Sequence, residues 1–174
     1  PEGWDRVETL EVDSKGRPWV GTWGDGMAVY DGYSWNRYTT ADGLVNDQIV
    51  DLLVDRHDRV WGIGLVGGVS RLDSEYRDLL TTEDGLGHNL VVCAMEAADG
   101  SMWFGGYGGS ISRRKDGQLL TWSVGEYSGN WGGVVWEIVE DGAGTVWARQ
   151  EDILIRFDGQ DWKAVDEPPC AVGD

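Results

Sequence analysis

Short apolar segments alternate with turn residues along the whole chain, and this pattern predicts β-strands. Within the first 40 residues we predict four strands, at residues 6–12, 17–22, 27–30 and 34–38. The segments between them are rich in Gly and Asp, which tolerate the positive φ angles of tight turns. No segment has the 3.6-residue periodicity of an amphipathic helix, so the sequence predicts an all-β fold.

One sequence unit occurs four times. Its most visible marker is a tryptophan, spaced by 42, 42 and 44 residues: Trp19, Trp61, Trp103 and Trp147. Twelve residues before each of them stands an aliphatic residue: Val7, Ile49, Val91 and Val135. Six residues before the repeated Trp, three of the units have an Asp: Asp13, Asp55 and Asp141. The third unit has Ala97 at this position. Agreement in several columns over four copies identifies an internal repeat.

Four antiparallel strands in every repeat are typical of the blades of a β-propeller. We predict one domain, residues 1–174, with blades at approximately 4–43, 44–86, 87–128 and 129–167 and a C-terminal tail at 168–174. The chain opens on a first strand and closes after a fourth strand, so no strand is left over to complete a partner blade. We expect a closed four-bladed ring or half of an eight-bladed ring made by two chains, and a part of a larger ring is the third alternative. An open array would expose apolar blade faces.

The four repeated tryptophans are expected to be structural. Each lies on the second strand of its unit beside small residues such as Gly21, and its large flat ring is suited to packing against the next blade. The Asp six residues earlier is expected to accept backbone N–H groups in the turn between the first and second strands. The alternative role for this Asp, calcium binding, requires several further oxygen ligands nearby.

The charge of the chain excludes some classes of partner. The sequence has 14 Lys and Arg against 31 Asp and Glu, a formal net charge of −17. Such an acidic surface repels phosphate backbones and anionic lipids, so we expect neither nucleic acid nor a membrane surface as partner. No apolar run approaches the ~20 residues of a transmembrane helix and no signal peptide is evident. The two cysteines, Cys93 and Cys170, do not suggest a disulfide framework. From the four complete blades we expect a monomer or a homodimer.

The repeat resembles a known family, the two-component regulator propeller repeat. The motif that carries the resemblance is Asp13-x-x-Gly16-x-x-Trp19-Val20-Gly21-Thr22, followed by Gly26-Met27-x-x-Tyr30 and by Asp42-Gly43-Leu44. The resemblance covers about residues 4–165 and is strongest in the first two units. In the third unit the turn Asp shifts to Asp99, and in the fourth Arg149-Gln150-Glu151-Asp152 replaces the glycine-rich elements. The resemblance implies an extracytoplasmic sensing domain of a bacterial hybrid two-component sensor, often for carbohydrate-derived ligands.

Loops on one face of the ring are the predicted ligand site. Because the strands alternate in direction, the loops after each second strand and each fourth strand share this face. They carry aromatic side chains beside polar ones, which is the lining that a sugar or another small polar ligand requires. The predicted ligand-binding residues are Trp23, Asn46, Asp47, His88, Asn89, Tyr107, Trp131 and Arg149. The alternative is that these are solvated loop tips together with a hydrophobic seal over the central channel.

A second polar column is expected to face the central channel. It lies ten residues before each repeated Trp and consists of Thr9, Asp51, Cys93 and Glu137. Acidic groups that face each other there could hold a cation or ordered water, and we expect water. We therefore predict no cofactor and no metal site.

The sequence favours a non-catalytic binding module over an enzyme. It has two histidines, His57 and His88, and lacks the usual hydrolase, zinc-protease and phosphate-loop motifs. The rival enzyme is a lyase of the streptogramin-inactivating type, for which His88 with Glu126 or Asp47 would be the catalytic remnant. A structural or designed propeller without any ligand is the other alternative.

Overall fold

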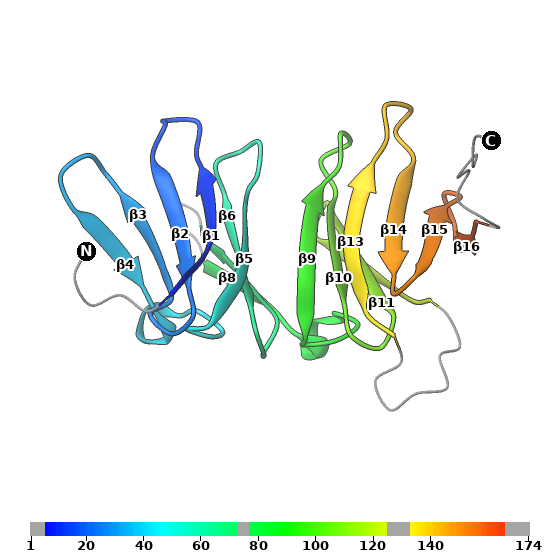
Figure 1. Ribbon diagram of the computed structural model, residues 1–174, viewed down its shortest axis with the longest axis horizontal. Helices are drawn as coiled ribbons and strands as arrows, with labels where there is room; N and C mark the ends of the chain where they lie inside the picture. The colour runs from blue at the N-terminus through cyan, green and yellow to red at the C-terminus, as the bar shows by residue number, and fades with distance from the viewer. Residues whose placement is uncertain (1–5, 73–76, 125–132, 166–174) are drawn as a thin grey trace, which may run out of the picture.

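The computed structural model describes residues 6–72, 77–124 and 133–165. In these parts of the chain, sixteen strands form four antiparallel sheets, each with its strands in chain order (Figure 1). Blade 1 contains β1 (Val7–Val12), β2 (Pro18–Thr22), β3 (Met27–Tyr30) and β4 (Trp35–Tyr38). Blade 2 contains β5 (Ile49–Val54), β6 (Val60–Gly64), β7 (Val69–Leu72) and β8 (Arg77–Leu80). Blade 3 contains β9 (Val91–Glu96), β10 (Met102–Gly106), β11 (Ser110–Lys115) and β12 (Gln118–Ser123). Blade 4 contains β13 (Val135–Glu140), β14 (Val146–Gln150), β15 (Ile153–Phe157) and β16 (Trp162–Ala164). The predicted all-β propeller fold with four-stranded blades is confirmed.

Glycine is required where the loop after the second strand returns the chain to the third. Gly26 has a φ of +74°, and a Cβ atom there would lie 2.1 Å from the carbonyl oxygen of Tyr38. Gly68 occupies the same position in blade 2, where a Cβ would lie 2.1 Å from the carbonyl oxygen of Leu80. Both the left-handed conformation and the close approach to β4 or β8 exclude a side chain.

Two short 3-10 helices in the connections between blades were not predicted. They are η1 (Thr40–Asp42) and η2 (Thr82–Asp84). Each begins with a capping box: in η1 the Asp42 carboxylate accepts the backbone N–H of Thr39 at 3.0 Å. The sequence signal for this structure is Thr-x-x-Asp, which occurs in both connections.

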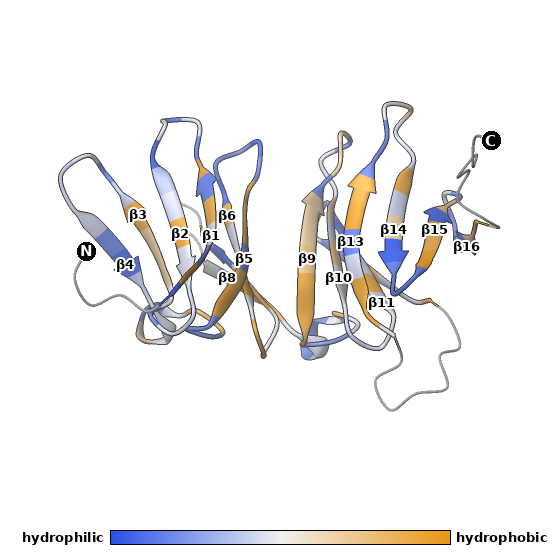
Figure 2. Ribbon diagram, in the orientation of Figure 1, coloured by the Kyte–Doolittle hydropathy of each residue, from blue (hydrophilic) through white to orange (hydrophobic). Residues whose placement is uncertain are grey.

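The core lies in three layers between neighbouring blades. Figure 2 shows long apolar runs in the strands β5 and β9. Buried apolar residues on the second and third strands of the blades continue the core beyond these first strands. Each layer joins the Trp-bearing face of one blade to the aliphatic face of the next; the layer between blades 1 and 2, for example, contains Trp19, Met27, Ile49 and Leu52. Trp61 and Trp103 are the largest of the fully buried side chains. The structural role predicted for these tryptophans is confirmed.

In blades 1, 2 and 4 the repeated tryptophan donates its indole N–H to the turn Asp of its own unit. Asp55 accepts the Trp61 Nε1–H at 2.8 Å and the backbone N–H groups of His57 and Arg59 at 2.9 and 3.0 Å. Burial by itself would raise the pKa of Asp55, but the hydrogen bonds from Trp61 and Arg59 outweigh it and hold that pKa below its usual value. These donors occupy both carboxylate oxygens, as the turn prediction requires. In blade 3, where Ala97 replaces the Asp, the Ser101 hydroxyl accepts the indole N–H instead, at 3.0 Å.

The predicted closed four-bladed ring is wrong. Figure 1 shows an open arc in which β4 of blade 1 and β16 of blade 4 lie at opposite ends of the molecule. The inner strands β1, β5, β9 and β13 contact one another in sequence order, and no layer joins blade 4 back to blade 1 in the described chain. The physical reason is the angle at which each blade packs on the next, which carries four blades through only part of a circle.

Within the described residues, no helix has the length and apolar character needed to cross a bilayer.

Candidate functional site

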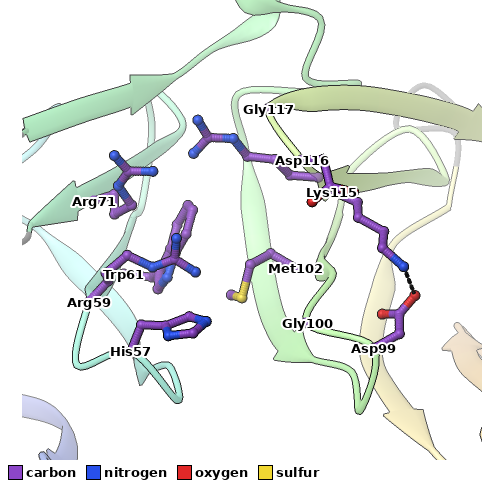
Figure 3. Close-up of a pocket in the computed structure, with 11 residues that line it drawn as sticks. His57, Arg59, Trp61, Arg71, Asp99, Gly100, Met102, Lys115, Asp116 and Gly117 are labelled. Atoms are coloured by element: carbon purple, nitrogen blue, oxygen red, sulfur yellow. Dashed lines mark hydrogen bonds and ion pairs between the residues drawn. The ribbon is translucent and has the colours of Figure 1, made fainter.

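A pocket of about 380 Å³ lies between blades 2 and 3, on the side of the turns that join first to second and third to fourth strands. Blade 2 contributes one wall and blade 3 the other, as Figure 3 shows. The lining residues are His57, Arg59, Trp61, Arg71, Asp99, Gly100, Met102, Arg114, Lys115, Asp116 and Gly117.

Strand register explains why two arginines meet in this pocket. Arg71 on β7 is paired with Trp61 on β6, so both side chains lie on the face of blade 2 that packs against blade 3. Arg114 on β11 is paired with Met102 on β10, which places both on the opposing face of blade 3. Trp61 and Met102 are buried within the layer between the blades and form the apolar floor, so the guanidinium groups occupy its rim.

Three guanidinium groups surround a single indole ring. The central carbons of Arg59, Arg71 and Arg114 lie 5.9, 5.7 and 5.6 Å from the ring centroid of Trp61. Contact with the face of an aromatic ring stabilises a guanidinium group and holds its orientation. Positive charge is therefore concentrated and fixed at this point of an otherwise acidic chain.

The neighbouring carboxylates neutralise this charge only in part. Asp78 Oδ2 is shared by two arginines, at 2.6 Å from Arg114 Nη2 and 3.7 Å from Arg71 Nη1. Arg59 pairs with Asp55 at 2.5 Å. The Nη1 atom of Arg114 is buried and has no hydrogen-bond partner among the described residues. A buried charged donor without an acceptor is costly, and an anion in the pocket would satisfy it.

Asp99 separates this pocket from a second one. Lys115 Nζ and Arg113 Nη2 both lie 2.7 Å from Asp99 Oδ2, and Figure 3 shows the Lys115 contact as a dashed line. Burial by itself would raise the pKa of Asp99, but the hydrogen bonds from Lys115 and Ser101 outweigh it and hold that pKa far below its usual value. Asp99 is therefore ionised at any physiological pH.

The second pocket is the structural equivalent of the first, one blade further along. It has a volume of about 370 Å³ and lies between blades 3 and 4, where Trp103 and Arg113 take the places of Trp61 and Arg71. Its charged lining residues are one cation and three acids, Arg113, Asp99, Glu140 and Asp158. The first pocket has four cations and two acids, Arg59, Arg71, Arg114, Lys115, Asp99 and Asp116. The repeat itself produces the crevice, but the cationic lining belongs to the crevice between blades 2 and 3.

Four of the predicted ligand-binding residues serve the connections in which they lie. Asp47 accepts the backbone N–H of Thr40 at 2.6 Å, and Asn89, its equivalent in the next repeat, accepts that of Thr82 at 2.7 Å. At the preceding position, Asn46 Oδ1 and His88 Nδ1 each accept a backbone N–H two residues further on, at 2.7 and 2.9 Å. The same bonds in two repeats indicate a structural role in the turn.

Of the remaining predicted residues, Trp23 and Tyr107 follow the second strands of their blades, whereas Arg149 lies within β14. Within the described chain, their contacts do not bring the three together. The rings of His88 and Tyr107 are 6.2 Å apart, while Trp23 lies under the guanidinium of Arg6 at 5.1 Å. Arg149 Nε is 3.7 Å from Glu137 Oε2. Trp131, and the Glu126 of the lyase alternative, lie outside the described residues. A ligand site on this loop face stays a prediction.

The residues of the predicted channel column interact with one another: Thr9 forms a hydrogen bond with Asp51, and the charges of Asp51 and Glu137 act on Cys93. Burial raises the pKa of Asp51 to about 6, and the nearby charge of Glu11 adds to the effect. Burial also raises the pKa of the Cys93 thiol to about 12, with contributions from the charges of Asp51 and Glu137. Such a thiol stays protonated and is a poor nucleophile at neutral pH. Among the described residues, no group of three or more His, Cys, Asp or Glu side chains is arranged to hold a metal ion.

Sequence reasoning missed the cationic pocket. The face of the short turns was set aside because its Asp and Gly residues are needed by the turns themselves. A signal was present: Arg71 and Arg113 both lie ten residues after a repeated Trp, and Arg59 lies two residues before one. Only the packing of blade 2 on blade 3 brings Arg114 to this group.

Comparison with known families supports the resemblance seen in the sequence. The family described as Two component regulator propeller matches residues 73–108, which run from the end of blade 2 into blade 3. The predicted recognition is therefore confirmed, although the match lies beyond the first unit, where the motif is most complete. No curated protein sequence matches the chain.

Solved structures share the fold at low sequence identity. The extracellular domain of BT4673 from B. thetaiotaomicron has a TM-score of 0.77 and 17% identity, over 92% of this chain and 23% of that one. For the extracellular domain of BT3049 from the same organism the values are 0.67 and 17%, over 82% and 20%. Catalytically inactive H270A virginiamycin B lyase from Staphylococcus aureus with quinupristin gives 0.74 and 14%, over 98% and 59%. These likenesses establish the propeller fold, and the chain spans less than a quarter of the BT4673 domain.

Proposed function

We propose that this chain, whose residues 73–108 carry the two component regulator propeller repeat, is a non-catalytic, extracytoplasmic sensing module that binds a small carboxylate-bearing ligand. The observation that carries the proposal is the pocket between blades 2 and 3, where three guanidinium groups surround Trp61 in a chain of net charge −17. A cationic cavity in a strongly acidic protein is a specific feature that the repeat by itself does not produce.

The location and the sensing role are supported by the family and by the structural relatives. BT4673 and BT3049 are described as one component or hybrid two component systems, and the matching parts are their extracellular domains. The chain corresponds to a minor part of those domains, so the whole-protein role is carried over as a proposal. Sensing requires binding without turnover, which agrees with a site made of guanidinium groups around an apolar floor.

The chemistry of the pocket favours a planar anion. Guanidinium groups bind carboxylates through two parallel hydrogen bonds, and Arg114 offers a buried Nη1 that lacks an acceptor. The apolar floor of Trp61 and Met102 excludes water beneath the anion and strengthens the interaction. A sugar acid combines a carboxylate with the carbohydrate character that the family resemblance implies, and it is our proposed ligand class.

Calorimetric titration with oligogalacturonate, against the neutral galacto-oligosaccharide of equal length, tests the proposal. We expect binding of the acidic oligomer only, weakened at least about tenfold by Arg114→Met because one charge-assisted hydrogen-bonding group is lost. Arg113→Met is the matched control, since Arg113 is the adjacent residue on the other face of β11 and lines the acidic pocket. Equal binding of the neutral oligomer, or equal losses in the two variants, would overturn the proposal.

The lyase alternative has the fold in its favour but not the contacts. Virginiamycin B lyase shares the propeller architecture at 14% identity, which carries no residue role to this chain. Of its candidate residues, His88 accepts the backbone N–H of Leu90 through Nδ1, and Asp47 accepts both the N–H and the hydroxyl of Thr40. These side chains are engaged in the turns, which favours the binding role.

A further inference from the structure

In the second pocket, between blades 3 and 4, an aromatic ring takes the place that an arginine has in the cationic pocket. Arg114 follows the residue that pairs with the repeated Trp of blade 3, and Phe157 follows the residue that pairs with the repeated Trp of blade 4. Phe157 is half-buried and meets the ring of Trp103 edge-on, with the ring centroids 5.1 Å apart. One position of the repeat therefore presents a guanidinium group to the cationic pocket and an aromatic ring to the second pocket.

Two further cations are exchanged in the same way. Arg59 and Ser101 each lie two residues before a repeated Trp, so a hydroxyl group replaces a guanidinium group. Lys115 and Asp158 each follow the pair of residues compared above, so a carboxylate replaces an ammonium group. Glu140 adds another carboxylate to the second pocket. An aromatic ring beside hydroxyl and carboxylate groups is suited to an uncharged sugar, while the carboxylates repel an anion.

The cation that the second pocket keeps, Arg113, has a donor to offer. Its Nη2 atom lies 2.7 Å from Asp99 Oδ2, and its central carbon lies 5.3 Å from the ring centroid of Trp103. Its Nε atom is buried and has no hydrogen-bond partner among the described residues. A buried donor without an acceptor is costly, and a sugar hydroxyl can accept this bond without bringing a further negative charge.

A smaller depression joins the two pockets along the edge of blade 3. It has a volume of about 150 Å³ and is lined by Arg113, Lys115, Asp116, Gln118 and Leu120. It shares Lys115 and Asp116 with the cationic pocket, and Arg113 with the second pocket. The three depressions therefore adjoin one another along the hairpin of β11 and β12.

This hairpin has a minimal turn where the three depressions adjoin. Asp116 and Gly117 alone connect β11 to β12, and both have positive φ angles, 50° and 79°, as in the tightest hairpins. The corresponding turns of blades 1 and 4 contain four residues each, 31–34 and 158–161. Figure 3 shows the short turn at the border of the cationic pocket. An extended ligand can therefore pass from one pocket to the other without meeting a longer loop.

We propose that the ligand is an oligosaccharide of mixed sequence that crosses blade 3, with one acidic sugar in the cationic pocket and an uncharged sugar in the second pocket. The inference rests on the proposed function and extends it from a single sugar acid to a sequence of sugars. The two pockets have volumes of about 380 and 370 Å³, within the range of small-molecule sites.

Each pocket then recognises one part of the ligand. The carboxylate binds the guanidinium groups around Trp61, while the uncharged sugar packs on Phe157 and accepts the Nε–H of Arg113. A homopolymer of galacturonic acid is held through one residue only, because its next carboxylate would meet Asp158 and Glu140.

Calorimetric titration with three kinds of probe tests the inference. The probes are monomeric galacturonate, trigalacturonate, and trisaccharides of one galacturonate and two galactose residues with the acid at either end. We expect one mixed trisaccharide to bind at least about tenfold more tightly than the other two kinds of probe. Equal affinity of the monomer or of trigalacturonate would overturn the inference and leave the proposed function standing. Absence of binding by every acidic probe would overturn both.

Phe157→Leu removes the aromatic ring of the second pocket. Leu72 occupies the equivalent position in blade 2, so the repeat accepts leucine here. The mixed trisaccharide should bind about tenfold more weakly, while monomeric galacturonate keeps its affinity. Tyr33→Leu is the matched control, since Tyr33 is 96% exposed in the turn between β3 and β4, and it should bind both probes as the wild type does.

Asp158→Asn tests the charge of the second pocket by a separate route. Asp158 Oδ1 accepts the backbone N–H groups of Gln160 and Asp161 at 2.9 and 2.8 Å, and the amide oxygen of Asn can accept both. Trigalacturonate should gain at least about threefold in affinity, while the monomer should gain nothing. In either variant, equal changes for the monomer and the trisaccharide would refute a second sugar position.

Discussion

Replacing Asp51 by Asn should stabilise the protein at neutral pH and leave it unchanged in acid. Asp51 lies on β5, where burial raises its pKa from 3.8 to about 6. Between these two values the folded protein keeps the proton that the unfolded chain has released. The stability contributed by the protonated carboxyl is therefore complete below pH 3.8 and is lost as the pH rises through about 6.

The size of the effect follows from the shift. A difference of about two pKa units corresponds to about 3 kcal/mol of unfolding free energy, since each unit is worth about 1.4 kcal/mol. Asn keeps an acceptor for the backbone N–H of Leu52, which Asp51 Oδ1 accepts at 2.9 Å, and carries no charge to bury. Asp51→Asn should therefore be more stable than the wild type by up to about 3 kcal/mol above pH 7.

Urea unfolding at about pH 4 and above pH 7, followed by circular dichroism at one protein concentration, measures this difference. The midpoint gain should appear only at the higher pH. Asp152→Asn, at an exposed position of the loop after β14, is the matched control and should shift neither midpoint. An equal gain for Asp51→Asn at both pH values would show that the effect comes from packing, and would refute the role assigned to the buried charge.

Two further predictions concern the tryptophans and the loop face. Trp61→Ala should cost about 3–5 kcal/mol of unfolding free energy, against about 1–2 for Trp35→Ala, because Trp61 is buried between two blades and Trp35 is partly exposed on the outermost strand. Equal losses in a urea melt would contradict the layered core. Trp23→Ala combined with Tyr107→Ala should leave the melting curve and the affinity for oligogalacturonate nearly unchanged, because these loop tips lie on the opposite side of the arc from the cationic pocket. Loss of binding in that double variant would move the ligand to the loop face.

The local structure was largely predictable from the sequence. Strand positions follow from the apolar segments, and the four predicted strands of the first unit differ from β1 to β4 by at most one residue at each end. The role of the turn Asp was also predictable, because an Asp at a fixed distance before a Trp recurs in three units and its bonds lie within one turn. The short η1 and η2 helices were missed, although the Thr-x-x-Asp signal was present in both connections.

The candidate site was less predictable. The loop face was chosen for its variable aromatic and polar residues, but Asn46 and Asp47 form hydrogen bonds within their own connection. The cationic pocket depends on Arg71 and Arg114, which belong to different repeats and meet only because their strands face each other across a blade interface. A spacing within one repeat cannot reveal a contact between two.

The sequence by itself determined the unit: four strands, a buried Trp, its Asp acceptor and one apolar stripe for each blade face. These features depend on bonds and alternation within about 40 residues, which the repeat encodes directly. The tertiary structure alone decided how the units are arranged, because the angle between blades is the sum of many side-chain contacts across each layer. The packing of blade 2 on blade 3 brings three arginines around Trp61, a grouping that no single repeat contains.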